Sequence, residues 1–298
     1  MSSILTLNNI VKSYGRIKAL NGVWLEVPPG SVFGILGPNG SGKTTLLSII
    51  LDVLKADVGN FLWFGEPSSH EQRKKIGSLL ETPNFYHYLS AVNNLKITLS
   101  ISGRGNMEMI DSVLEKVKLY ERRNSRFSTY SLGMKQRLAI AAALLGDPKV
   151  LVLDEPTNGL DPVGIAEIRD LIIELSKKGH TIIMASHLLD EVEKVCTHVA
   201  ILKKGTLLTT GDVNDVLVDD DLVEISADNL DALSNAINDY GHGIKITRDG
   251  NTLQLILPKG TAKLDDINNH CFSKGIVLNH LLFKKKRLEA KFFELTNN

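Results

Sequence analysis

The sequence has no excess of charge of either sign, almost no cysteine and no long apolar run. Its 298 residues include 34 lysines and arginines against 34 aspartates and glutamates, whereas general nucleic-acid binding rests on an excess of basic residues. The two cysteines, Cys196 and Cys271, provide neither a disulfide framework nor a C-x-x-C metal pair. No apolar run approaches the roughly 18 residues that span a bilayer, and Met1 to Ile4 lack the basic and apolar segments of a secretory signal. We therefore expect a soluble, cytosolic protein.

The composition that remains is typical of a globular chain, with 43% hydrophobic and 23% charged residues. Short apolar runs recur between stretches of helical spacing, at Val32–Leu36, Val150–Leu153 and Thr181–Ala185. Because such runs are typical of strands buried on both faces, they predict a parallel sheet in an α/β domain over residues 1–215. Strand signals fade between Tyr86 and Leu145, where helical spacing over 107–119 and 138–145 predicts a mostly helical insertion at about 86–145.

A smaller α+β domain is expected over residues 220–298. Two short strands flank Asp249-Gly250, a pair that favours a tight hairpin turn. With two amphipathic helices and two further strands they predict a β-α-β-β-α-β module, with elements at 222–225, 229–240, 244–247, 253–257, 264–272 and 276–283.

The end of the chain has a basic run followed by apolar residues at helical spacing. The basic run is Lys284 to Arg287, and the apolar residues are Leu288, Phe292, Phe293 and Leu295. Such a segment favours contact with anionic lipid headgroups, but a solvated helix face has the same pattern. The sequence leaves both interpretations open.

One segment matches the phosphate-loop pattern G-x-x-x-x-G-K-[ST] in full. It consists of Gly37, Pro38, Asn39, Gly40, Ser41, Gly42, Lys43 and Thr44, and Thr45 follows at the start of an apolar helix. Glycines let successive backbone N–H groups point at a phosphate, and the helix N-terminus favours an anion. Lys43 is expected to reach the β- and γ-phosphates of ATP, and the Thr44 hydroxyl to bind Mg²⁺. The alternative is a glycine-rich turn with a surface lysine.

Two acidic residues, Asp154 and Glu155, follow the apolar run that begins at Val150. Ligands of open parallel sheets bind beyond the carboxyl ends of the strands. Asp154 is therefore expected to hold Mg²⁺, directly or through water, and Glu155 to accept a proton from an attacking water. The alternative is an acidic cap for a helix that begins near Pro156.

Between and after these motifs lie Tyr130-Ser131-Leu132-Gly133-Met134-Lys135-Gln136-Arg137, Asn158-Gly159-Leu160-Asp161 and Ser186-His187. In this order, over about residues 1–215, the chain resembles the ATP-binding cassette of an ABC transporter. The resemblance implies a P-loop NTPase fold, α/β with a mixed sheet core, a helical subdomain and here a small C-terminal α+β module. One departure is Leu132, which stands where many cassettes have glycine, so close backbone approach is in question at that position.

The resemblance also implies roles for single residues. Ser131 and Gly133 would contact the γ-phosphate held by the partner subunit, and Asp161 would cross the dimer interface near the catalytic acid. His187 would bridge the γ-phosphate and Glu155, and Tyr14 would stack on adenine. Taken alone, Ser131 fits a helix N-cap, His187 a structural histidine and Tyr14 a loop tyrosine.

A second departure is Glu81, which stands where most cassettes carry glutamine. Ionised glutamate offers only acceptors and a full charge, unlike an amide. Together with the residues after it, glutamate at this position makes the sequence similar to the bacitracin and lantibiotic-resistance type of exporter ATPase. Glu81 is expected to contact the metal and to couple hydrolysis to the membrane partner; a solvated loop acid is the alternative.

The resemblance implies ATP and Mg²⁺ as cofactors, a homodimer of cassettes and integral-membrane permease subunits that dock near Phe85 to Leu99. It places the protein in the cytoplasm, peripheral on the inner face of the cell membrane, as an exporter ATPase of the antibiotic or peptide resistance type, with no nucleic acid expected. Two alternatives remain: a non-transport ABC ATPase that acts on nucleic acid or ribosomes, and a binding module without hydrolysis.

Overall fold

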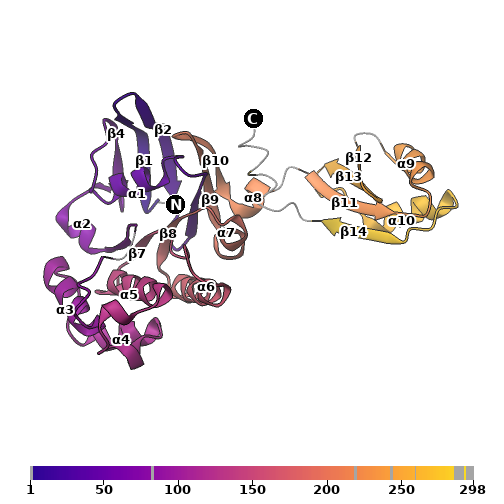
Figure 1. Ribbon diagram of the computed structural model, residues 1–298. Helices are drawn as coiled ribbons and strands as arrows, with labels where there is room; N and C mark the ends of the chain where they lie inside the picture. The colour runs from indigo at the N-terminus through magenta and orange to yellow at the C-terminus, as the bar shows by residue number, and fades with distance from the viewer. Residues whose placement is uncertain are drawn as a thin grey trace. The chain divides into compact units, whose positions relative to one another are not determined.

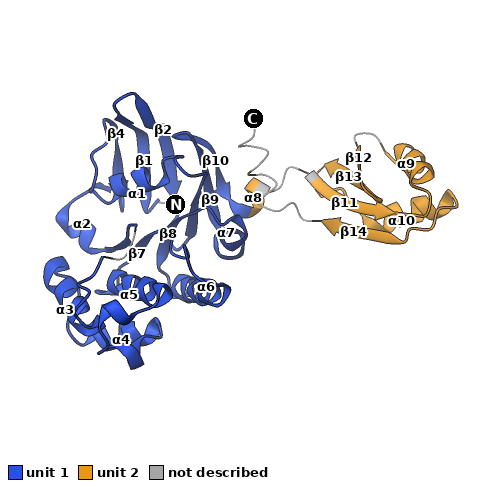
Figure 2. Cartoon of the chain, in the orientation of Figure 1, with its two compact units in different colours: residues 1–213 blue, residues 214–298 orange. Residues whose placement is uncertain are grey.

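The computed structural model describes residues 3–81, 84–217, 220–241, 244–258, 260–284 and Phe292. The chain forms two compact units, Met1–Val213 and Asn214–Asn298 (Figure 2). The predicted basic and apolar segment after Lys284 lies outside the described residues except for Phe292. Within the described part of the chain, no helix combines the length and the apolar character needed to cross a membrane.

The first unit is built on a central sheet of six strands in the order β10-β9-β3-β8-β7-β6. These strands are β3 (Val32–Leu36), β6 (Ile76–Leu79), β7 (Val150–Asp154), β8 (Thr181–Ser186), β9 (His198–Lys203) and β10 (Thr206–Asp212). Strands β7, β8, β9 and β10 are labelled in Figure 1. All neighbours pair in parallel except β10, which is antiparallel to β9. Every residue of β3, β7 and β8 is buried. The prediction of buried parallel strands is therefore confirmed, and the sheet is mixed.

A second, antiparallel sheet lies beside the central one, in the order β2-β1-β4-β5. Its strands are β1 (Leu5–Tyr14), β2 (Ile17–Val27), β4 (Val58–Trp63) and β5 (Glu66–Pro67). One apolar core joins residues of β1 and β3 to residues of helix α1 (Lys43–Ile50). Trp63 is fully buried in this core, and its indole N–H donates to the carbonyl of Ile50 at 2.8 Å. Burial of each large apolar side chain stabilises this packing by about 1.5–3 kcal/mol, so α1 is held firmly between the sheets.

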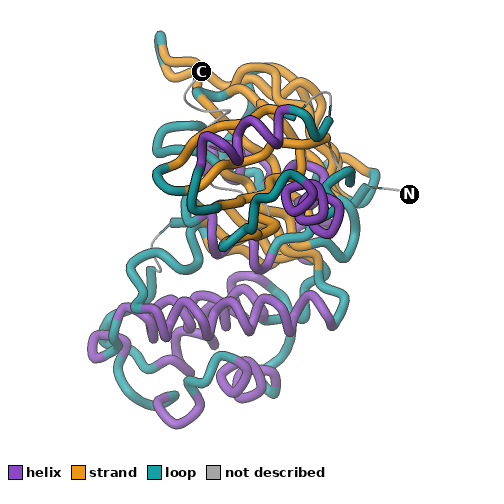
Figure 3. Tube along the Cα trace, turned by 90° about the vertical axis from the view of Figure 1, so that its right-hand side faces the viewer, coloured by secondary structure: helices purple, strands orange, loops and turns teal. Residues whose placement is uncertain are grey.

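The segment between residues 86 and 145 is mostly helical, and in Figure 3 its helices gather below the strands. It contains α3 (Ala91–Ser102), α4 (Met109–Lys116), α5 (Leu132–Leu144) and two short 3₁₀ helices, Tyr120–Arg122 and Phe127–Thr129. Apolar spacing predicts α5 only from residue 138, but the helix begins at Leu132 because Ser131 caps it and accepts from the N–H of Met134. α5 packs closely on β6, where a side chain at Gly77 would overlap the carbonyl oxygen of Ala143.

The remaining helices of the first unit flank the central sheet. They are α2 (His70–Lys74), α6 (Pro162–Lys177) and α7 (Leu189–Val195). Asp161 is the N-cap of α6, and its carboxylate accepts from the N–H of Gly164 at 3.0 Å. The short helix α8 (Val213–Leu217) follows β10.

The second unit is an antiparallel sheet in the order β12-β13-β11-β14, with two helices. Its elements are β11 (Asp220–Ser226), α9 (Leu230–Asn238), β12 (Lys245–Asp249), β13 (Thr252–Pro258), α10 (Leu264–Ser273) and β14 (His280–Lys284). Buried residues of β11 and β13 share one apolar cluster with residues of α9 and α10. The predicted element order is confirmed, including the hairpin, where Gly250 has a φ of +56°.

The last strand of the second unit is shorter than the sequence predicts. It begins at His280 and not at Ile276. Gly275 ends α10 with a φ of +77°, and the N–H of Ile276 donates back to the carbonyl of Cys271. The apolar residues 276–278 are thereby held outside the strand.

Candidate active site

The predicted phosphate loop joins β3 to α1. Gly42 has a φ of +105°, and a Cβ there would lie 2.5 Å from the carbonyl oxygen of Ala19. Glycine is required at that position because both the backbone conformation and the space exclude a side chain. α1 begins at the next residue, Lys43, so the loop presents the N-terminus of a helix, which favours an anion.

Lys43 lies inside the loop and not on the surface. Only 7% of its side chain is exposed, and the ammonium donates to the carbonyl of Gly37 at 2.8 Å and to that of Pro38 at 3.3 Å. The same ammonium lies 3.9 Å from Oε1 of Glu155. Burial lowers the pKa of Lys43, while the carboxylates of Glu155 and Asp154 act in the opposite direction. A glycine-rich turn with a solvated lysine does not fit these contacts.

Asp154 ends β7 and is buried, with 3% of its surface exposed. Burial raises the pKa of Asp154, against a hydrogen bond from the Thr44 hydroxyl that favours the ionised form. Its Oδ1 is a buried oxygen without a hydrogen-bond partner among the described residues. An unpaired buried carboxylate oxygen beside a hydroxyl is a donor set that suits Mg²⁺, so the residues present fit that ion.

Glu155 follows Asp154 with a φ of +47°, a left-handed conformation that is uncommon for glutamate. Its N–H donates to the carbonyl of Ala185 on β8, so the turn is tied to the neighbouring strand. His187, just beyond β8, donates from Nδ1 to Oε2 of Glu155 at 2.8 Å. The predicted pair of Glu155 and His187 is therefore in direct contact, because the carboxyl ends of the adjacent strands β7 and β8 lie side by side.

Two cavities meet at the phosphate loop. The first, of about 610 Å³, is lined by Tyr14, Ile17, Lys18, Ala19, Asn39, Gly40, Ser41, Gly42, Lys43, Thr44, Thr45, Glu155 and Lys204. Tyr14 lines it with 48% of its surface exposed, and the ammonium of Lys12 lies 5.9 Å from the centre of its ring. A cavity of this size, lined by an aromatic ring and by the phosphate loop, suits a nucleotide.

The second cavity, of about 310 Å³, holds the acidic residues. It is lined by Thr44, Glu81, Leu132, Gln136, Asp154, Glu155, Asn158 and Gly159. Glu81 has a φ of +55° and faces the same space as Asp154, whose pKa its charge helps to raise. The structure thus brings Glu81 to the predicted metal residues; Thr82 and Pro83, which follow it, lie outside the described residues.

Six predicted site residues line neither cavity. The carbonyls of Gly37 and Pro38 accept from Lys43, and His187 contacts Glu155. The other three are Ser131, Gly133 and Asp161. Ser131 and Asp161 are the N-caps of α5 and α6, and both are exposed. Ser131, Gly133 and Asp161 therefore line no cavity at the phosphate loop of their own chain, although Leu132, between the first two, lines the second one.

The cavities also include residues that the sequence analysis did not single out, namely Lys18, Lys204, Gln136 and Asn158. Lys204 belongs to the turn between β9 and β10, and the next residue, Gly205, donates its N–H to the carbonyl of Ser41 at 2.9 Å. A contact between segments so distant in the chain has no local sequence signal.

The arrangement combines anion-binding N–H groups, a buried ammonium and a carboxylate oriented by a histidine. A carboxylate in this position is able to accept a proton from water beside a bound phosphate. The chemistry that fits is hydrolysis of a nucleoside triphosphate.

Comparison with protein-family models finds a match to the ABC transporter family over residues 20–158. The bacitracin transport ATP-binding protein BcrA of Bacillus licheniformis is 43% identical over 212 residues, which cover 70% of this chain and 69% of that protein. The lantibiotic transport ATP-binding protein SrtF of Streptococcus pyogenes is 38% identical over 205 residues, covering 69% of this chain and 89% of that protein.

Among solved structures, the chain is similar to the dimeric ATP-binding cassette MJ0796 in a post-hydrolysis state bound to ADP and Pi. The TM-score is 0.63 and the identity 28%, over 70% of this chain and 98% of that one. The similarity therefore leaves 30% of this chain unmatched.

Proposed function

Because this chain belongs to the ATP-hydrolysing ATP-binding proteins of ABC transporters, we propose that it drives export of a peptide antibiotic by closing as a homodimer over ATP. The observation that supports catalysis most directly is the contact of Glu155 with both Lys43 and His187 at the phosphate loop. The likeness to bacitracin and lantibiotic transport proteins supports the substrate class.

In the proposed mechanism, the phosphate loop binds the β- and γ-phosphates through its N–H groups and Lys43. Lys43 donates to the carbonyls of Gly37 and Pro38, and it exchanges these partners for phosphate oxygens when nucleotide enters. Tyr14 stacks on the base, which positions the triphosphate along the first cavity. Charge stabilisation by positioned donors supplies most of the catalysis in phosphoryl transfer.

Glu155 orients the attacking water and accepts its proton, and His187 holds the carboxylate in place through its Nδ1–H. Thr44 and Asp154, with Glu81 facing them, would hold Mg²⁺, which when bound supplies positive charge that offsets the negative charge of the phosphates. The unpaired Oδ1 of Asp154 supports that assignment.

The homodimer part of the proposal rests on three exposed or partly exposed residues that do not line the cavities. Ser131, Gly133 and Asp161 line neither cavity of their own chain, and the N-cap of a helix is a site for anions. In a two-fold dimer each subunit would present these residues to the nucleotide of its partner. Each of the two active sites is then built from both subunits.

The transport part of the proposal requires a separate integral-membrane permease and a peripheral position on the inner face of the membrane. The helical segment offers exposed aromatic side chains at Tyr86 and Tyr88, 50% and 70% exposed. We propose that the permease docks there, so that closure of the dimer moves the permease. Large exposed apolar surfaces are typical of interaction sites.

The test of the catalytic part uses the full chain with Glu155→Gln. The variant should bind ATP with magnesium, release no phosphate and sediment as a dimer, whereas wild type should return to monomer as ATP is consumed. Asp170→Asn, an acid change on exposed α6 surface, is the matched control and should behave as wild type. A Glu155→Gln protein that stays monomeric at saturating ATP would contradict the dimer mechanism.

The test of the export part is sensitivity of cells. A strain without this chain should become more sensitive to bacitracin or to a lantibiotic, and wild type but not Glu155→Gln should restore resistance. Unchanged sensitivity to both classes, with co-purification of nucleic acid in place of a membrane protein, would favour the non-transport alternative.

A further inference from the structure

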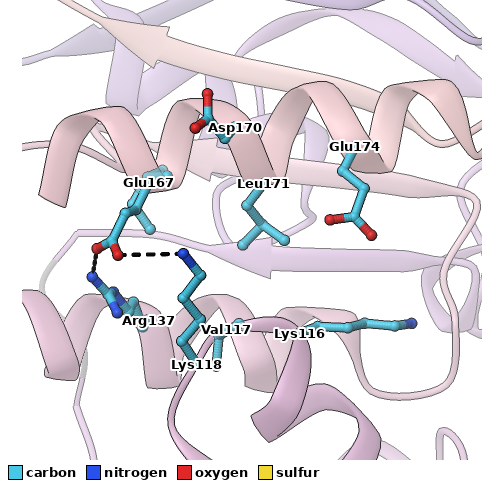
Figure 4. Close-up of a pocket in the computed structure, with 9 residues that line it drawn as sticks. Lys116, Val117, Lys118, Arg137, Glu167, Asp170, Leu171 and Glu174 are labelled. Atoms are coloured by element: carbon cyan, nitrogen blue, oxygen red, sulfur yellow. Dashed lines mark hydrogen bonds and ion pairs between the residues drawn. The ribbon is translucent and has the colours of Figure 1, made fainter. Parts of the chain in front are cut away.

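Charged residues of opposite sign face each other across a small pocket between the helical segment and α6 (Figure 4). The pocket has a volume of about 170 Å³. Basic residues on one side are Lys116, Lys118 and Arg137. On the other side Glu167 and Glu174 point toward them, whereas the carboxylate of Asp170 points away (Figure 4). All three acids lie on α6, whereas the basic residues lie on α5 and at the end of α4.

Glu167 is the acid that makes direct contact across the pocket. Its carboxylate forms a close ion pair with Arg137 of α5 and a second one, of 3.4 Å, with Lys118. Arg137 and Glu167 are 19% and 28% exposed, so salt and water screen this pair less than a pair on the open surface. Asp170, by contrast, pairs with Arg169 of its own helix.

The two helices joined by this ion pair begin at the two caps that the proposed dimer uses. Ser131 caps α5 and Asp161 caps α6. Arg137 lies six residues after Ser131, and Glu167 lies six residues after Asp161. Since a helix rises about 1.5 Å per residue, the ion pair holds both helices at the same distance, about 9 Å, from their caps.

Apolar contacts join the same two elements at the caps themselves. A Cβ at Gly159 would lie 2.7 Å from Cδ2 of Leu132, and a Cβ at Gly133 would lie 3.6 Å from Cδ2 of Leu160. Leu132, the residue that departs from the glycine of other cassettes, thus covers Gly159. The ion pair joins the same part of the fold further along the helices.

We propose that Glu167 is a positioning residue, whose ion pairs with Arg137 and Lys118 hold Ser131 and Asp161 in one fixed arrangement for the partner's nucleotide. The proposal rests on the dimer mechanism above and deepens it. Glu167 lines neither nucleotide cavity, so its loss should leave the first, monomeric binding of ATP intact. It should weaken closure, because the two caps would no longer be presented together.

The test measures dimer formation and hydrolysis in the full chain with Glu167→Gln. In the Glu155→Gln background, the variant should raise the dimer dissociation constant about tenfold, the range expected for coupled ion pairs. With Glu155 intact, kcat should fall by a similar factor at saturating ATP. Binding of a fluorescent ATP analogue to the monomer should be unchanged, which a general loss of structure would not allow.

Three further variants control the result. Asp170→Asn removes an acid from the same helix and should have no effect. Lys118→Asn removes one ion pair at a residue with a φ of +57°, which asparagine tolerates, and should weaken the dimer by about twofold to threefold. Arg137→Glu combined with Glu167→Arg reverses the ion pair and should restore most of the dimer affinity that Glu167→Gln loses. Lys118 would then face an arginine, but its side chain is highly exposed and is able to turn into solvent.

The outcomes separate the two proposals. If Glu155→Gln alone fails to dimerise, the dimer mechanism is wrong. If Glu155→Gln dimerises and both Glu167→Gln and Lys118→Asn dimerise equally well, the positioning role of Glu167 is overturned. Equal effects of Glu167→Gln and Asp170→Asn would also overturn it, because general surface charge would then explain the change.

Discussion

Replacement of His187 by alanine should reduce the rate of ATP hydrolysis without weakening ATP binding. Nδ1 of His187 donates to Oε2 of Glu155 at 2.8 Å, and the side chains are 44% and 22% exposed. A hydrogen bond to a charged group contributes about 1.5–3 kcal/mol. Because His187 is nearly half exposed, water is able to replace part of the contact, and the lower value applies. A loss of about 1.4 kcal/mol corresponds to a tenfold lower kcat.

The assay is phosphate release by the full chain at saturating ATP and magnesium, with KM determined in the same series. His187→Gln should retain more activity than His187→Ala, since its amide also donates a hydrogen bond to a carboxylate. His70→Ala is the matched control, because His70 is 72% exposed on α2 and lines neither cavity. An unchanged kcat for His187→Ala, or a change confined to KM, would refute orientation of Glu155 by His187.

Further predictions concern packing, the metal side of the site and the second unit. Gly77→Ala should lower the free energy of unfolding of the first unit by about 1–3 kcal/mol, since the new methyl group overlaps the carbonyl of Ala143. Urea unfolding followed by tryptophan fluorescence measures this change, because both tryptophans lie in the first unit. Glu81→Gln should raise the magnesium concentration needed for half-maximal hydrolysis, and unchanged hydrolysis and transport would remove its special role. The hydrogen bond from Lys284 lowers the pKa of Glu224 below its ordinary 4.5. The stability that this hydrogen bond contributes to the second unit is therefore present above pH 4.5 and is lost as the pH falls below that value. In Lys284→Met, the protection of the β11 amides against hydrogen exchange should therefore depend less on pH below pH 4.5.

The parts of the site that follow a single strand could be predicted from the sequence. The phosphate loop and Asp154 each come directly after a buried apolar run, so their place at the edge of the sheet follows from chain order alone. The contact of Glu155 with His187 joins residues 32 positions apart. It depends on β7 and β8 being neighbours, a pairing that the family pattern implied and that apolar runs alone do not specify.

The parts that depend on distant packing could not be predicted. Lys204 reaches the nucleotide cavity because the turn after β9 is hydrogen-bonded to Ser41. Glu167 and Arg137 lie on helices with ordinary surface patterns, and charged helix residues are usually solvated. Arg137 and Glu167 pair because α5 and α6 approach each other there, and Lys118, just after α4, gives Glu167 a second partner. Likewise, apolar spacing places the start of α5 too late, because its first turn is determined by the Ser131 cap and not by burial.

The distribution of charge around the two cavities explains why nucleotide and metal should bind together. Glu81, Asp154 and Glu155 line one cavity, and a nucleoside triphosphate would add further negative charge beside them. Lys43 is the buried ammonium that faces them, and it lies 3.9 Å from Glu155. Like charges at short range disfavour each other in a site of low dielectric. Because no lysine or arginine among the described residues lines the second cavity, Lys43 alone leaves its three carboxylates uncompensated. The unpaired Oδ1 of Asp154 is where a divalent cation would restore the balance. Glutamate at position 81 adds one more negative charge than glutamine would, so the need for that cation should be greater in this chain than in cassettes with glutamine.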